Sequence, residues 1–118
     1  MPEGPEVETI RRTLENHVRE KRIESIWRSD LALKTPSASK DFDFLLGERI
    51  QSLSRVGKLL VVDTGRERGL FVRFGMSGRL LFCDSDSPLE KHTHLRIRFE
   101  DSELRYVDPR RFGDLMPF

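Results

Sequence analysis

Residues 59–74 read Leu-Leu-Val-Val-Asp-Thr-Gly-Arg-Glu-Arg-Gly-Leu-Phe-Val-Arg-Phe. Two apolar runs, Leu59 to Thr64 and Leu70 to Phe74, have the length of strands and are rich in the branched and aromatic residues that strands favour. Gly65 and Gly69 bracket the polar residues between the runs, which is typical of a hairpin turn. The stretch therefore predicts two antiparallel strands joined by a short turn.

Further short runs of the same kind flank this hairpin. They are Ile23 to Arg28, Arg49 to Val56, Arg79 to Phe82, His94 to Phe99 and Leu104 to Val107. Polar segments separate them, including a loop at residues 84–91 and a turn at residues 100–102. Many short strands with turns between them predict a β-sandwich or barrel.

The N-terminal segment has a different period. Val7, Ile10, Leu14 and Val18 recur at helical spacing, so residues 5–17 are predicted to form an amphipathic helix. Arg11 and Arg12 would form a basic face on this helix. The predicted fold class of the whole chain is mainly β (α+β), with this helix at the N-terminal end of the β body.

Composition limits the size and class of the protein. A chain of 118 residues with 36% hydrophobic content is expected to form one domain, residues 1–118. Its net charge of +1 means that binding to a polyanion must depend on local clusters of basic residues. Cys83 is the single cysteine, which excludes an intrachain disulfide and a zinc site of several thiolates. No apolar run approaches the roughly 18 residues of a membrane span, so we expect an intracellular protein.

The first residues carry chemistry of their own. Removal of Met1 would leave Pro2 with a secondary amine, which condenses with an aldehyde to give a positively charged iminium. Glu3 and Glu6 could move protons beside it. The same segment is equally compatible with a plain helix start, with Pro5 in the first turn and carboxylates near the positive end of the helix dipole.

Other motifs also have two interpretations. Lys58 stands at the start of the most apolar strand. Its ammonium group either faces a cleft at a functional site or is a surface charge that limits aggregation of the strand. Met76, in Gly75-Met76-Ser77-Gly78, either projects from a turn or fills a gap in the core. In the loop from Asp108 to Gly113, arginines suit phosphates and Phe112 could wedge between bases, unless it is buried.

His92 and His94 are spaced to share one face of a strand, as metal ligands sometimes do, but the sequence offers no third ligand. Phosphate contact or packing is the preferred interpretation.

Together these segments resemble the N-terminal domain of formamidopyrimidine-DNA glycosylases, a family that includes endonuclease VIII. The shared features are Pro2-Glu3, Pro5-Glu6-Val7-Glu8, Lys58-Leu59-Leu60, Gly75-Met76-Ser77-Gly78, Lys91-His92-Thr93-His94 and Asp108-Pro109-Arg110-Arg111-Phe112-Gly113. The resemblance implies an antiparallel β-sandwich flanked by helices. It also implies a bifunctional glycosylase and lyase that removes 8-oxoguanine and formamidopyrimidines from double-stranded DNA and then cuts at the abasic site.

The resemblance assigns roles to individual residues. Pro2 is similar to the nucleophile that attacks C1′ and forms a Schiff base, and Glu3 to the acid that protonates the sugar as its ring opens. Glu6 supports that acid-base work, and Lys58 reaches the lesion's phosphate and transfers protons during β-elimination.

A second group resembles residues that hold DNA. Phe112 is similar to a wedge in the base stack, whereas Met76 and Arg110 fill the space left by the extruded base. Arg111 and His92 resemble contacts to the DNA backbone. No metal or cofactor is expected in this chain.

Two positions depart from the family pattern. Gly4 stands where formamidopyrimidine-DNA glycosylases usually carry leucine, and Arg73 stands where a histidine lies near the DNA phosphates. Family members also have a helix-two-turn-helix domain and a zinc finger, which we expect to be absent here. Such a chain is expected to be a monomer with weak DNA binding and little turnover, and the alternatives are a non-catalytic damage sensor or a protein-interaction sandwich.

Overall fold

The predicted hairpin of residues 59–74 is present in the computed structural model, which describes residues 3–31, 33–35 and 37–118. Strand β3 (Leu59–Asp63) pairs antiparallel with β4 (Gly69–Arg73). The Thr64 amide donates to the Arg68 carbonyl across the turn, at 3.1 Å. The structure therefore confirms the hairpin that two apolar runs around a glycine-bounded turn predicted.

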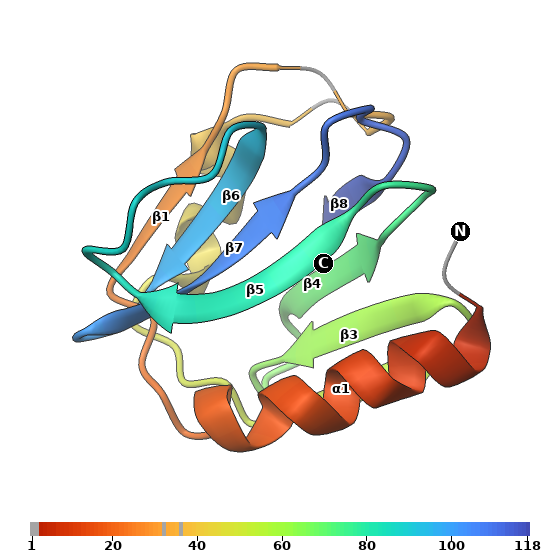
Figure 1. Ribbon diagram of the computed structural model, residues 1–118. Helices are drawn as coiled ribbons and strands as arrows, with labels where there is room; N and C mark the ends of the chain where they lie inside the picture. The colour runs from red at the N-terminus through yellow and green to blue at the C-terminus, as the bar shows by residue number, and fades with distance from the viewer. Residues whose placement is uncertain (1–2, 32, 36) are drawn as a thin grey trace.

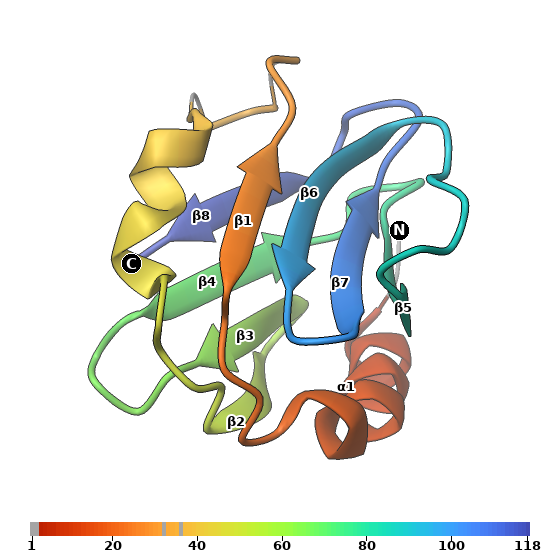
Figure 2. The ribbon, with the colours of Figure 1, turned by 90° about the vertical axis from the view of Figure 1, so that its left-hand side faces the viewer.

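Two antiparallel sheets form the body of the protein (Figures 1 and 2). One has the order β2-β3-β4-β8, with β2 at Ser52–Val56 and β8 at Asp114–Pro117. The other has the order β1-β6-β7-β5. Its strands are β1 (Ser25–Arg28), β5 (Arg79–Asp84), β6 (Thr93–Arg98) and β7 (Ser102–Val107). This arrangement confirms the predicted sandwich.

Apolar side chains from both sheets meet in the core. Leu60 and Val72 of one sheet and Ile97 and Leu104 of the other are each almost fully buried in the same cluster. Burial of this apolar area is the main free-energy term that favours folding. It also holds the turns at the ends of the strands in fixed positions.

Helix α1 (Gly4–Val18) lies along one side of the sandwich and contacts β2, β3 and β5 (Figure 1). It buries Val7, Leu14 and Val18, the stripe that the spacing predicted. The opposite side is not a free basic face, because Arg11 and Arg12 both pair with Glu8, at 2.7 and 3.0 Å. A short 3-10 helix, η1 (Ser39–Leu45), buries Phe42 and Leu45 next to β1.

Strand β8 was not predicted from the sequence. It has only four residues and ends with Pro117, which lacks the amide that a central strand needs. The structure places it at the edge of its sheet, where it pairs with β4 alone and proline is tolerated. Tertiary pairing, not local pattern, makes this segment a strand.

An ion-pair network lies on strand β7 and its neighbour. Glu103 and Arg105 are both fully buried, and the Arg105 Nε donates to Glu103 Oε2 at 2.6 Å. Arg96 of β6 donates to the same carboxylate, at 2.7 Å. Arg105 also donates to the Ser87 and Pro88 carbonyls, so the network fixes the loop between β5 and β6.

Within the described ranges, no helix combines the length and the apolar character needed to cross a bilayer.

Candidate functional site

Glu3 immediately precedes α1, and its carbonyl accepts the amides of Glu6 and Val7, at 3.1 and 3.0 Å. Its side chain makes no capping hydrogen bond to the helix, although this is the position where a side chain often caps. Instead Oε2 lies 3.2 Å from Nζ of Lys58. The carboxylate is therefore held at the start of the helix and turned toward a cation.

Lys58 lies in the two-residue turn between β2 and β3. Gly57, the first residue of that turn, has a φ of +61°, which glycine adopts without steric cost. The Lys58 side chain is half exposed, at 49%. The hairpin thus presents an ammonium group on open surface beside the helix start.

Gly4 makes room for a second cation at this place. A Cβ atom on Gly4 would lie 2.8 Å from Nη1 of Arg55. That guanidinium donates to the Gly57 carbonyl at 2.9 Å and lies 3.6 Å from Glu8. Arg55 therefore links α1 to the residue before Lys58, in space that a larger side chain at position 4 would occupy.

The other predicted acid-base residues lie at the same end of the helix. Glu6 is exposed in its first turn. Pro2, the predicted nucleophile, lies outside the described residues. The structure therefore brings Glu3 next to Lys58 and places Glu6 in the helical turn that follows Glu3.

The predicted wedge residues project from two loops. Met76 is 61% exposed in the turn between β4 and β5, and Phe112 is 41% exposed in the loop between β7 and β8. The alternative in which either side chain fills the core is therefore wrong. Arg110 is also exposed, and its guanidinium carbon lies 4.7 Å from the centre of the Phe112 ring.

These loops lie on the same side of the molecule as the start of α1. The two ribbon views agree that the β4–β5 turn and the β7–β8 loop are neighbours, toward the upper right of Figure 1, above the N-terminal end of α1. Arg73, the last residue of β4, is part of this region and pairs with Leu59 in the sheet. The face combines cations, carboxylates and exposed apolar side chains.

The two predicted histidines do not share a strand face. His92 is exposed and lies just before β6, with a φ of +65°. His94 is buried, and its Nδ1 and Nε2 atoms contact the Ser29 hydroxyl and the Asp108 carbonyl, each at 2.9 Å. The backbone turn at His92 breaks the alternation on which the prediction depended.

Arg111 is exposed in the same loop as Phe112, with a φ of +54°.

The sequence did not predict a role for Asp108, although the motif that contains this residue was noted. Asp108 is fully buried and accepts hydrogen bonds from several loop residues. The sequence signal that could have indicated this role is an aspartate at the start of a loop that ends in glycine, Asp108 to Gly113.

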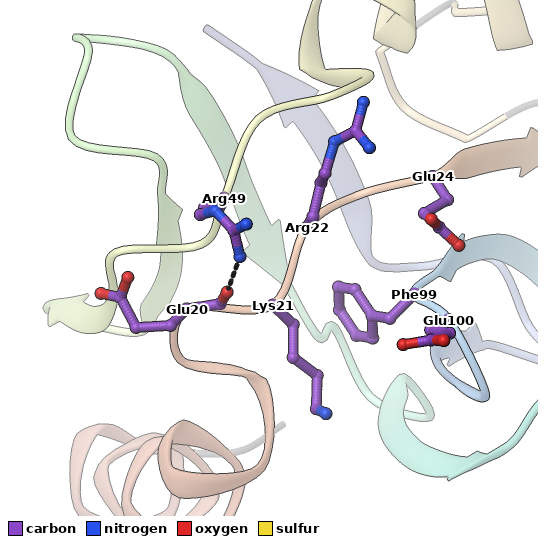
Figure 3. Close-up of a pocket in the computed structure, with 7 residues that line it drawn as sticks. All are labelled: Glu20, Lys21, Arg22, Glu24, Arg49, Phe99 and Glu100. Carbon is purple, nitrogen blue, oxygen red and sulfur yellow. Dashed lines mark hydrogen bonds between the residues drawn. The ribbon is translucent and has the colours of Figure 1, made fainter.

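A surface pocket of about 340 Å³ lies elsewhere, beside the C-terminal end of α1 (Figure 3). Charged side chains and Phe99 line it, and the Arg49 guanidinium donates to the Glu20 carbonyl at 2.9 Å. None of the predicted catalytic or DNA-binding residues lines it. In the part of the chain that the structure describes, no three His, Cys, Asp or Glu side chains are grouped to hold a metal ion.

Known proteins resemble this chain in sequence and in fold. Residues 1–115 match the family described as formamidopyrimidine-DNA glycosylase N-terminal domain. The chain belongs to this family. Among relatives named formamidopyrimidine-DNA glycosylase, that of Desulforamulus reducens is 41% identical over 96% of this chain. That of Stutzerimonas stutzeri is 43% identical over 98% of it.

Solved structures of the family have the same fold. Lactococcus lactis Fpg (MutM) in complex with DNA containing N7-benzyl-Fapy-dG matches 99% of this chain, with a TM-score of 0.85 and 35% identity. MutM in complex with DNA containing carbocyclic 8-oxo-G matches with a TM-score of 0.91 and 35% identity, again over 99%. The chain covers 42% and 43% of the two curated relatives and 44% of each of these structures.

Proposed function

We propose that this chain is the catalytic domain of a bifunctional DNA glycosylase and abasic-site lyase for oxidised purines, such as 8-oxoguanine and formamidopyrimidine. The observation that carries the proposal is the Glu3–Lys58 ion pair at the start of α1, on the same side as exposed Met76 and Phe112. Acid-base groups and an apolar wedge are the two components that excision of a base from a duplex requires. The named relatives support the same activity.

In the proposed reaction the amine of Pro2, after removal of Met1, attacks C1′ of the damaged nucleoside. The bond from C1′ to the base breaks, and the base leaves with the bonding electrons and takes up the proton that the Pro2 nitrogen loses. Glu3 delivers a proton to the ring oxygen O4′ as the sugar opens, which gives an iminium at Pro2. The iminium is an electron sink that allows loss of a C2′ proton and departure of the 3′ phosphate.

The remaining site residues hold the DNA. Lys58 is placed to contact the lesion's phosphate and to relay protons, and Glu6 supports the acid-base steps. Arg111 and His92 contact the backbone, where cations neutralise phosphates. Phe112 enters the base stack, while Met76 and Arg110 occupy the gap, which offsets the few kcal/mol that base flipping costs.

Borohydride trapping on abasic DNA tests the chemistry. The protein is a fusion of this chain, without Met1, to the C-terminal part of the Desulforamulus reducens relative that this chain does not match, and the intact relative is the positive control. Reduction of the iminium should give a covalent adduct, and peptide mapping should locate it on the peptide that begins with Pro2.

Two results would contradict the proposal. An adduct on Lys58 would identify a different amine as the nucleophile. DNA binding by the fusion with no adduct, under conditions in which the relative gives one, would indicate a non-catalytic damage sensor.

A further inference from the structure

The two loops that carry the wedge residues touch through their backbones. A Cβ atom on Gly75 would lie 2.5 Å from both the Gly113 nitrogen and the Phe112 carbonyl carbon. A Cβ atom on Gly113 would lie 2.3 Å from the Arg73 carbonyl oxygen. The β4–β5 turn and the β7–β8 loop therefore pack so closely that only glycine fits at these two positions.

Asp108 joins the same loops from below the surface. One carboxylate oxygen accepts the Ser77 hydroxyl at 2.6 Å and the Arg111 amide at 3.1 Å. The other accepts the Tyr106 hydroxyl and the Gly113 amide, each at 2.9 Å. Burial alone would raise the pKa of Asp108, but these donors hold its pKa below the ordinary value. The carboxylate is therefore charged at neutral pH, and hydrogen bonds to it are charge-assisted.

Ser77 completes the connection. Its hydroxyl group donates to Asp108, and the oxygen of the same group accepts the Arg110 amide, at 3.3 Å. Ser77 directly follows Met76, so one hydroxyl group links the Met76 turn to the backbone of Arg110. Met76 and Phe112 nevertheless remain exposed. The backbone that carries these exposed side chains is therefore anchored before any partner arrives.

We propose that Ser77 and Asp108 are positioning residues, which hold the two loops as one rigid unit so that Met76, Arg110 and Phe112 are preset to fill a gap in a base stack. This inference rests on the proposed function. Ordering mobile loops at the moment of binding would subtract from affinity, and preorganisation removes that cost. The unit should therefore affect discrimination between gapped and intact duplexes more than general attraction to DNA.

Substitution of Ser77 tests the proposal on the 118-residue chain. Two duplexes of one sequence are compared, one intact and one with a tetrahydrofuran abasic analogue, at several salt concentrations. Ser77→Ala should reduce the ratio of the two affinities about tenfold, the equivalent of one hydrogen bond to a charged group. Ser77→Thr retains the hydroxyl and should restore the ratio. Ser54→Ala, at an exposed serine of β2, is the matched control and should behave as the parent.

Two further measurements separate positioning from a general loss of structure. The salt dependence of binding should be the same in all variants, because the phosphate contacts remain. Amide hydrogen exchange at Arg110, measured without DNA, should be faster in Ser77→Ala and normal in Ser77→Thr, since this amide loses its acceptor only in the alanine variant.

The outcomes distinguish this inference from the function on which it rests. Equal affinity of the parent chain for both duplexes would overturn both. Discrimination by the parent that Ser77→Ala retains in full would overturn the positioning role and leave the proposed function standing. If Ser77→Ala loses discrimination between the duplexes and Ser77→Thr does not restore it, the positioning role is also rejected, because the Ser77 hydroxyl would not be the cause of the discrimination.

Discussion

The Nζ atom of Lys58 lies 3.2 Å from Oε2 of Glu3, so the turn between β2 and β3 is electrostatically joined to the residue before α1. Both side chains are about half exposed, at 49% and 61%. An exposed ion pair of this kind contributes little to stability, typically under about 1 kcal/mol. The pair is therefore not a major source of stability.

Lys58→Gln should therefore separate stability from function. We expect the midpoint of thermal unfolding to change by no more than about 4 °C, because the exposed pair contributes under about 1 kcal/mol. The rate of strand cleavage at an abasic site, measured with the fusion protein, should fall at least tenfold because the ammonium group no longer assists proton transfer in the β-elimination. Lys40→Gln, at an exposed lysine of η1, provides the control. An unchanged rate of strand cleavage in Lys58→Gln would remove this residue from the mechanism.

Removal of the wedge should reduce affinity without unfolding the protein. Phe112→Ala truncates a side chain that is 41% exposed, so the free energy of unfolding should change by about 0.5 kcal/mol or less. Binding to the abasic duplex should weaken roughly fivefold to a hundredfold, because loss of one stacking contact costs about 1–3 kcal/mol of binding free energy. Fluorescence anisotropy measures this, with Leu89→Ala, at another exposed apolar residue, as control. Equal losses in both variants would argue against a wedge.

Gly4→Leu should compete with Arg55 for space. The new side chain must displace the Arg55 guanidinium from the Gly57 carbonyl. The guanidinium can move because it is the flexible end of a long side chain. We expect a loss of about 0.5–1.5 kcal/mol in the free energy of unfolding, the net value of one hydrogen bond. In an Arg55→Ala background the same substitution should cost less. Urea unfolding of the four proteins gives the coupling, and strictly additive effects would exclude this competition.

The buried pair of Glu103 and Arg105 should be sensitive to removal of one partner. Glu103→Ala removes the fully buried carboxylate of Arg105 and leaves only the partly exposed Glu90 as its ion-pair partner, which should cost about 3 kcal/mol. Replacement of both residues by apolar side chains of similar volume should cost less than the single change. Urea unfolding measures both variants, and a double variant that is no more stable than Glu103→Ala would contradict this account.

Stability should fall below neutral pH because of His94. Burial is the largest cause that lowers the pKa of His94, opposed by its hydrogen bond to the Asp108 carbonyl. The unfolded state, with an ordinary pKa of about 6.5, then takes up a proton at a higher pH than the folded state. The contribution to stability is complete above the unfolded pKa and is lost as pH falls from there toward the folded pKa. His94→Gln should be less stable at pH 7 but should lose less between pH 7 and 5, as measured by urea unfolding.

Several elements were predictable because their signals are local. The hairpin of β3 and β4 follows from two apolar runs and a glycine-bounded turn, and α1 follows from a helical repeat that buries Val7, Leu14 and Val18. The order of motifs along the chain also indicated the family. Strand β8 and the burial of His94 were not predictable in this way, because each depends on a partner strand or loop far along the chain.

The amino-acid sequence by itself determined helix α1, the strands other than β8, and the residue types available for catalysis and DNA binding. Only the tertiary structure decided which of them meet. Exposure of Met76 and Phe112, the Glu3–Lys58 pair and the loop contacts of Asp108 all depend on how the two sheets and α1 pack. The physical reason is that periodicity reports how neighbouring residues alternate between faces, whereas proximity and burial are set by contacts between segments distant in the chain.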